Sequence, residues 1–164
     1  MDVTDVPRFY IETSAWGSLA PRQPRDRKQV VRSLLSLLDG ARGTCVISVG
    51  VLMEIARAHP ADATVLREHI DRMRPVVYPV SEAMEVLAQA YLDAGILPER
   101  RREDALQVAA ATCIAADYLV SWNHRYMTRP RKRLQYEAVN QLNGYPKTPL
   151  ICNPVEACDE LRSR

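Results

Sequence analysis

The sequence of 164 residues is poor in aromatic side chains and in cysteine, and it lacks a long apolar run. It contains one phenylalanine, so aliphatic side chains must form most of the core. No stretch approaches the ~20 apolar residues of a transmembrane helix, so we expect no membrane-spanning segment. Residues 1–5 show neither the basic nor the apolar region of a secretory signal, so we expect a cytoplasmic protein.

The four cysteines show no C-x-x-C spacing that would indicate a metal site or a redox pair. Cys45 and Cys152 lie in strand-like runs, and Cys113 lies on a predicted helix beside small residues. A reducing compartment disfavours disulfides. Buried, reduced thiols are therefore favoured over zinc ligands or disulfides for these residues and for Cys158.

The net charge of +2 is too small to require a polyanionic partner, but the positive charges are clustered. The clusters are Arg22, Arg25, Arg27 and Lys28; Arg100 to Arg102; and Arg125, Arg129, Arg131, Lys132 and Arg133. Each cluster is either a solvated surface or a set of phosphate contacts. Because two of them flank predicted acidic-site elements, phosphate binding beside a metal is a specific hypothesis for those two.

Short apolar runs alternate with amphipathic segments, which is the pattern of strands alternating with helices. Strands are expected at 7–12, 44–48, 76–80, 118–122 and 149–152, and helices at 26–39, 51–58, 61–73, 82–93, 103–116, 134–142 and after residue 153. Ser81 and Asn153 are expected N-caps, Pro79 indicates an edge strand, and Thr13-Ser14 indicates a turn. The alternation predicts an α/β fold with a parallel sheet covered on both faces, in one domain spanning 1–164.

Three acidic residues lie where strands give way to helices. Glu12 ends the first strand, Glu54 follows the strand end at Ser48 by about one and a half helical turns, and Asp104 lies in the first turn of its helix. The helix dipole stabilises a negative charge at the last position. Since ligands of such sheets bind beyond the carboxyl ends of the strands, we expect the three carboxylates to share one pocket.

Neighbouring carboxylates repel one another unless a cation neutralises them. Carboxylate and water ligands suit Mg²⁺ or Mn²⁺, and the chemistry that such a site favours is phosphodiester hydrolysis. Spacing alone leaves simpler interpretations open. Asp104 could serve only as a helix cap, and Glu54 could be a solvated helix residue.

Four segments, in this order along the chain, resemble the motifs of PIN-domain proteins, especially the VapC-like toxin ribonucleases of bacterial toxin–antitoxin modules. They are residues 10–14, 47–55, 104–111 and 118–123, and the match covers nearly the whole chain. The resemblance implies a three-layer α/β/α PIN domain over residues 1–164 and Mg²⁺- or Mn²⁺-dependent cleavage of RNA. It also implies a small antitoxin partner and a homodimer.

The resemblance also implies roles for individual residues. Glu12 and Asp104 become the main metal ligands, and Glu54 becomes a further ligand, direct or through water. The implied catalytic set is Glu12, Glu54, Asp104 and Asn123, and the implied substrate-binding set is Ser14, Ser121, His124 and Arg125. Ser14 is expected to orient Glu12 or a phosphate.

Two positions depart from the motifs of the family. Glu12 replaces the usual Asp and would hold the metal farther from the strand. Asn123 replaces a common fourth Asp and contributes no charge, which weakens a second metal site more than the first. These departures keep a rival hypothesis open, namely a catalytically silent PIN-fold module that binds RNA or a protein. Asp117 precedes its strand and is expected at the opposite end of the sheet, and for Trp16 and Trp122 packing is favoured over base stacking.

Overall fold

The computed structural model describes residues 6–164 and has a five-stranded sheet at its centre. The strands are β1 (Arg8–Ile11), β2 (Thr44–Ser48), β3 (Val76–Tyr78), β4 (Tyr118–Val120) and β5 (Leu150–Cys152). They are all parallel and lie in the order β3-β2-β1-β4-β5. The predicted parallel sheet is confirmed, and β3 is an edge strand as Pro79 indicated.

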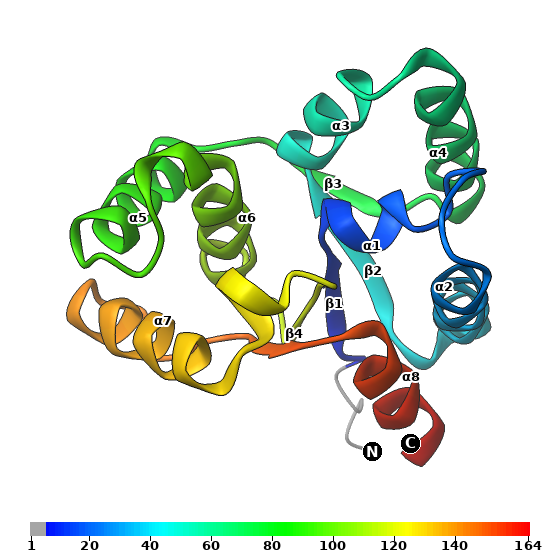
Figure 1. Ribbon diagram of the computed structural model, residues 1–164. Helices are drawn as coiled ribbons and strands as arrows, with labels where there is room; N and C mark the ends of the chain where they lie inside the picture. Colours follow the sequence, from blue (N-terminus) through cyan, green and yellow to red (C-terminus); the bar gives the residue numbers. More distant parts are fainter. Residues whose placement is uncertain (1–5) are drawn as a thin grey trace.

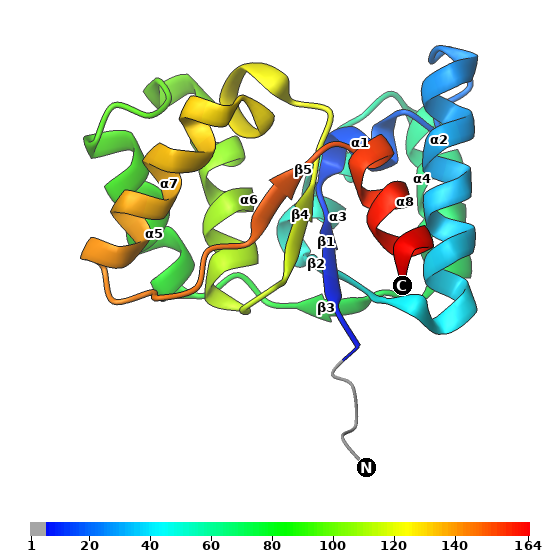
Figure 2. The ribbon, with the colours of Figure 1, turned by 90° about the horizontal axis from the view of Figure 1, so that it is seen from below.

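Helices cover both faces of this sheet (Figures 1 and 2). They are α1 (Thr13–Gly17), α2 (Arg25–Leu37), α3 (Val49–Ala56), α4 (Pro60–Met73), α5 (Glu82–Asp93), α6 (Arg102–Cys113), α7 (Pro130–Leu142) and α8 (Pro154–Ser163). Three short helical turns, η1 (Leu38–Arg42), η2 (Glu99–Arg101) and η3 (His124–Thr128), complete the set. Helices α5, α6 and α7 lie on one side of the sheet, and α2, α4 and α8 lie on the other. The predicted three-layer α/β/α arrangement is thus confirmed.

Most predicted elements are present, but several boundaries differ, most of all around α1, α6 and α7. Thr13-Ser14 begins helix α1 instead of forming only a turn, because the Glu12 carboxylate accepts the backbone N–H of Ser14 and caps the helix. Helix α7 begins at Pro130 rather than near Leu134, since proline suits the first helical position. Helix α6 ends at Cys113, before the predicted Ala116, and Ala115 beyond it has a φ of 55°.

The core lies on both faces of the sheet, as a doubly covered parallel sheet requires. Phe9 stacks on Tyr118, and the other inward-facing strand residues are mainly aliphatic. On α6, residues 109–111 are fully buried alanines, so this helix packs closely against the strands. The site-bearing ends of β1, β4 and α6 are therefore held in a well-packed frame.

The cysteines are all free thiols, as predicted. Cys45, Cys152 and Cys158 are buried, and Cys113 is partly buried beside the Tyr145 hydroxyl. Within residues 6–164, none of the helices combines the length and apolar character needed to cross a bilayer.

Candidate active site

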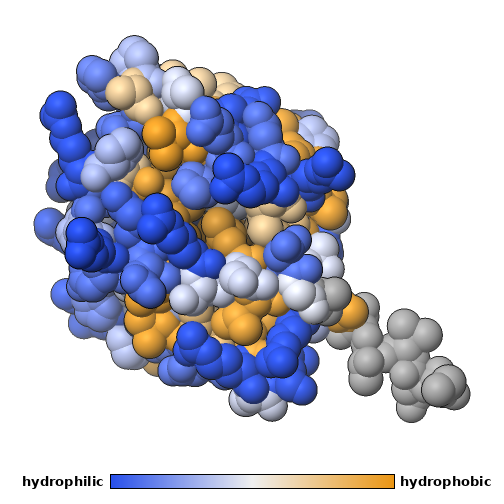
Figure 3. Space-filling view, turned by 90° about the vertical axis from the view of Figure 1, so that its right-hand side faces the viewer, coloured by the Kyte–Doolittle hydropathy of each residue, from blue (hydrophilic) through white to orange (hydrophobic). Residues whose placement is uncertain are grey.

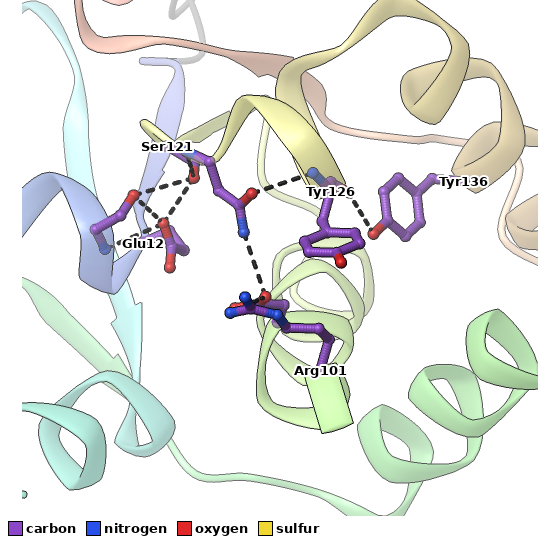
Figure 4. A network of polar contacts seen from close by, with 8 residues as sticks. Glu12, Arg101, Ser121, Tyr126 and Tyr136 are labelled. Carbon is purple, nitrogen blue, oxygen red and sulfur yellow. Dashed lines mark hydrogen bonds and ion pairs between the residues drawn. The ribbon is translucent and has the colours of Figure 1, made fainter. Parts of the chain in front are cut away.

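Glu12 lies at the carboxyl end of β1 and is only 3% exposed. Its Oε2 atom accepts three hydrogen bonds: from the Ser14 backbone N–H at 3.1 Å, from the Ser14 hydroxyl at 2.5 Å and from the Ser121 hydroxyl at 2.7 Å. Figure 4 shows Ser121 beside Glu12, with the hydrogen bond that joins them. Ser14 and Ser121 therefore fix the position of Glu12.

The same two hydroxyls organise the chain that follows β4. Ser14 Oγ accepts the backbone N–H of Trp122 at 2.9 Å, and Ser121 Oγ accepts that of Asn123 at 2.9 Å. The hydroxyl oxygens lie 3.2 Å apart. The first and fourth sequence motifs thus meet directly at one edge of the sheet.

Asn123 connects this serine pair to Asp104 on the neighbouring helix (Figure 4). Its amide nitrogen Nδ2 donates to Asp104 Oδ2 at 3.3 Å, and its Oδ1 accepts the backbone N–H of Tyr126 at 3.1 Å, which caps η3. Arg101 Nη1 lies 3.9 Å from the same Asp104 oxygen. The amide at 123 therefore makes a contact that an aspartate could not make, because an ionised carboxylate has no proton to donate.

Glu54 lies on α3 near Thr13 and Gln107, whose side chains partly offset the rise in its pKa that burial causes. Gln107 Nε2 also donates to Thr13 Oγ1 at 3.2 Å, and its Oε1 accepts from the buried hydroxyl of Tyr10. Tyr10 is bonded in turn to the Ser48 hydroxyl at 2.8 Å. A network of buried hydrogen bonds among these side chains therefore helps to fix the positions of the acidic residues.

The sequence interpretation missed the roles of Gln107 and Thr13. A signal was present for each, because Gln107 lies three positions after Asp104 on the same face of α6 and Thr13 directly follows Glu12. Neither residue type is diagnostic without the neighbouring helix in place.

Burial makes ionisation of the acidic side chains unfavourable, which raises their pKa values. Burial raises the pKa of Glu12 from 4.5 to about 7; hydrogen bonds from Ser14 and Ser121 lower it, and the nearby charges of Glu54 and Asp104 raise it. Burial also raises the pKa of Glu54 and of Asp104. The mutual charge effects indicate that the three carboxylates lie near one another, where a cation would relieve their repulsion.

The donor atoms suit a hard divalent cation, since they are carboxylate, hydroxyl and amide oxygens. Glu12 Oε1 makes no hydrogen bond within residues 6–164. This atom is not fully buried, so it is accessible to a ligand. In that same part of the chain, no three His, Cys, Asp or Glu side chains form a group that could hold a metal as they stand. The donor atoms therefore fit a divalent cation, while the carboxylates of Glu12 and Asp104 are hydrogen-bonded to neighbouring protein groups.

Other residues singled out by sequence have different surroundings. Asp117 lies at the opposite end of the sheet, as predicted, where it pairs with Lys147 Nζ at 2.6 Å and accepts the Arg8 backbone N–H at 2.7 Å. His124 and Arg125 are exposed on η3, beyond the residues that bond Glu12 and Asp104. His124 Nδ1 lies 3.2 Å from the Thr128 hydroxyl.

The two tryptophans differ in their surroundings. Trp16 is fully buried and its indole N–H donates to the Ile11 carbonyl at 3.0 Å, which confirms a packing role. Trp122 is half-buried, and the guanidinium of Arg27 lies 4.9 Å from the centre of its ring. The first basic cluster therefore reaches the residue beside Asn123.

No protein-family model matches the sequence, and no match is found among curated protein sequences. Among solved structures, the chain is similar to a chain of VapBC2 from Rickettsia felis, crystallised bound to a DNA fragment from their promoter. The TM-score is 0.58 at 15% sequence identity, over 89% of this chain and 98% of that chain. At this identity the likeness shows a shared fold, in agreement with the three-layer α/β/α fold that the sequence predicts.

Proposed function

We propose that this chain is a metal-dependent endoribonuclease and the toxin of a type II toxin–antitoxin pair. One observation carries the proposal: a continuous set of hydrogen bonds joins Glu12, Ser14, Ser121, Asn123 and Asp104 at the carboxyl edge of a PIN-like sheet. These residues come from separate parts of the chain, so their meeting is a property of the fold. Oxygen donors at this edge suit phosphodiester chemistry.

In this proposal Glu12 and Asp104 hold one Mg²⁺ or Mn²⁺ ion, with Glu54 as a further ligand, direct or through water. The bound cation supplies an activated water and offsets the charge that develops on the phosphoryl oxygens. Asn123 adds no charge, so a single metal site is favoured over a pair.

The protein groups around the acids have positioning roles in the proposed reaction. Ser14 and Ser121 hold Glu12, while Asn123 and Arg101 hold Asp104. His124 and Arg125 are exposed at the exit of β4 and can donate to phosphate oxygens of RNA. Ser14 and Ser121 are also proposed as substrate contacts because the PIN resemblance implies this role, while in this structure both hydroxyls donate to Glu12.

The proposed reaction is tested with single-stranded RNA and purified protein. We expect cleavage with Mn²⁺, no cleavage with EDTA, and loss of cleavage in Asp104→Asn and Glu12→Gln. The exposed Glu137→Gln on α7 is the matched control and keeps wild-type activity. Thermal melting verifies that each variant is folded. Metal-dependent cleavage that persists unchanged in both active-site variants contradicts the assignment of the site.

The proposed antitoxin contact is the face formed by α2, α4 and α8, on which Figure 3 shows hydrophilic residues separated by apolar areas. A cavity of about 320 Å³ between α2 and α4 is lined by Leu35 and Met73 together with Arg32, His69 and Arg72. Such a lining fits a segment with apolar and acidic side chains. We expect a small protein encoded next to this chain to co-purify with the wild type and not with Arg32→Glu/Arg72→Glu.

The proposed homodimer rests on the PIN resemblance, and the apolar side chains of Leu134 and Leu142 on α7 offer exposed surface for it. Size-exclusion chromatography with light scattering gives the mass directly. A monomer at micromolar concentration contradicts this part of the proposal.

The second candidate function is a catalytically silent PIN-fold module that binds RNA or a protein. Two observations favour it: Asn123 replaces an acid, and the carboxylates of residues 6–164 form no ready metal cluster. A metal that binds only the folded state raises the free energy of unfolding, by about 2.7 kcal/mol at a hundred times its Kd. If the melting temperature does not rise at millimolar Mn²⁺, the silent module is favoured over the metal-dependent ribonuclease.

A further inference from the structure

Beside the acidic cleft lies an open cavity of about 700 Å³. Its walls come from the loop between α5 and α6, from η2, from η3 and from the start of α7. We call this cavity the basic groove and define it by Arg100, Arg125, Tyr126, Arg129 and Lys132. Its volume lies within the range of roughly 300–1,000 Å³ that is common for ligand sites.

The groove has four cationic side chains and one carboxylate, Glu99. Glu99 is already paired with Arg102 at 2.5 Å, and Arg102 does not line the groove. None of the four cations forms an ion pair with another described residue, whereas many other surface arginines do. Lys132 Nζ donates to the Ile96 carbonyl, so the positive charge that is free to attract an anionic ligand is mainly that of the three arginines.

The groove and the acidic cleft share a wall. The ring of Tyr126 has the Arg125 guanidinium 5.2 Å from its centre and the Arg101 guanidinium 5.1 Å from it. Arg101 also lies 3.9 Å from Asp104, which joins the groove to the proposed metal ligands.

Tyr126 is itself well fixed (Figure 4). Its carbonyl accepts the Tyr136 hydroxyl at 2.7 Å, and its N–H donates to Asn123 at 3.1 Å. The ring is only 6% exposed, so it is a rigid partition between the groove and the cleft. A chain bound in the groove is thereby directed toward Asp104.

We infer that the basic groove binds backbone phosphates of single-stranded RNA on one side of the bond that the acidic cleft cleaves. This inference rests on the proposed function and names where its substrate lies. Guanidinium groups bind phosphates through paired hydrogen bonds, and three arginines are available here. The connection of the groove to the proposed phosphodiester site through Tyr126 and Arg101 favours RNA over an acidic peptide.

The test is binding of fluorescein-labelled single-stranded RNA in EDTA, measured by fluorescence anisotropy at several salt concentrations. Without metal the RNA stays intact, so the measurement does not depend on catalysis. We expect Arg125→Ala/Arg129→Ala to weaken binding roughly tenfold and to reduce the salt slope by about 1.4, the value for two lost contacts to a single strand. Arg100→Ala, on a separate element, is expected to act in the same direction.

The matched control is Lys147→Ala, an exposed cation that pairs with Asp117 at the opposite end of the sheet, which should bind within about twofold of the wild type. Wild-type affinity and salt slope in both groove variants overturn the inference. It is also overturned if polyglutamate binding depends on these arginines while RNA binding does not, since the groove would then serve an acidic protein segment.

The inference and the proposed function fail in different ways. If RNA binds in the groove but no metal supports cleavage, the groove is confirmed and the ribonuclease assignment fails. If the wild type cleaves RNA but the groove variants bind it normally, the ribonuclease stands and the groove is excluded as its substrate path.

Discussion

At the scale of single residues, Asn123 determines how much negative charge the cleft holds. Its Nδ2 lies 3.3 Å from an oxygen of Asp104, close enough that a second carboxylate there would be repelled. The pKa of Asp104 is already raised, chiefly by burial. The asparagine thus stabilises the metal-free protein by donating a hydrogen bond where charge would accumulate.

Asn123→Asp is expected to have opposite effects on the stability of the metal-free protein and on its stabilisation by metal. Without metal, the lost hydrogen bond and the added charge should lower the free energy of unfolding by about 1–3 kcal/mol. With Mn²⁺, the extra carboxylate should make the metal-induced rise in melting temperature larger than in the wild type. Thermal melting in EDTA and in millimolar MnCl₂ measures both effects.

The control for this variant is Gln23→Glu, which adds the same charge on an exposed loop and should leave both melting temperatures unchanged. A metal response in Asn123→Asp no larger than that of the wild type would show that residue 123 does not face the cation.

The residue-level arrangement was readable from sequence only in part. Glu12 and Asp104 could be placed because strand ends and helix starts meet at one edge of a parallel sheet. The bond between Asn123 and Asp104, and the support by Gln107, depend on the contact between the segment after β4 and α6. No local pattern encodes the distance between two such segments.

At the scale of elements, α6 has the greatest influence on the site, because it carries both Asp104 and Gln107. Its buried alanines allow the helix to lie close to β2 and β4. The position of the Asp104 carboxylate therefore depends on small side chains about two turns away along the helix.

Ala110→Leu is expected to push α6 away from the sheet. Ala110 is fully buried, and overpacking at such a position costs about 1–3 kcal/mol in the free energy of unfolding. Urea denaturation measures this loss. RNA cleavage by the folded fraction should also fall, because Asp104 moves relative to Glu12.

Ala138→Leu on α7 is the matched control, since Ala138 is exposed and the same change there should be nearly neutral. Equal urea midpoints for the two variants would show that the packing of α6 against the sheet does not depend on its small buried side chains.

Elements with local signals were predicted well, and elements that depend on distant contacts were not. Ser81 and Asn153 cap α5 and α8 through bonds within their own segments, including a capping box at Asn153, so sequence sufficed. Helix α1 is capped by Glu12, whose position depends in turn on Ser121, 109 residues away. A cap that is held by tertiary structure has no local signature.

At the scale of the whole molecule, the distribution of charge matters more than its total. Acidic groups are concentrated around Glu12, and the basic groove beside them holds cations that form no ion pair within residues 6–164. The acids destabilise the metal-free fold while they are ionised, which is the behaviour of a site that stores strain for function. The protein should therefore respond to pH and metal together.

Without metal, the free energy of unfolding should fall as pH rises from about 4.5 to about 7. The pKa of Glu12 is 4.5 when exposed and about 7 in the fold, so the folded state holds the proton more tightly across this window. Stability from this group is complete below pH 4.5 and is lost as pH passes 7. The loss is on the order of 3–4 kcal/mol, at about 1.4 kcal/mol for each pKa unit.

Mn²⁺ should reverse this trend, because the cation replaces the proton as the partner of the Glu12 carboxylate. The metal-induced rise in melting temperature is thus expected to be small at pH 5 and largest at pH 8, where the proton no longer competes. Melting curves in EDTA and in MnCl₂ across this range measure it. Glu12→Gln is the decisive comparison: the neutral amide should flatten the pH dependence without metal and also remove most of the metal response. Glu12→Gln could instead remove the pH dependence and leave the metal response intact. The ionised Glu12 carboxylate would then destabilise the fold without binding the metal, and the cation would lie elsewhere.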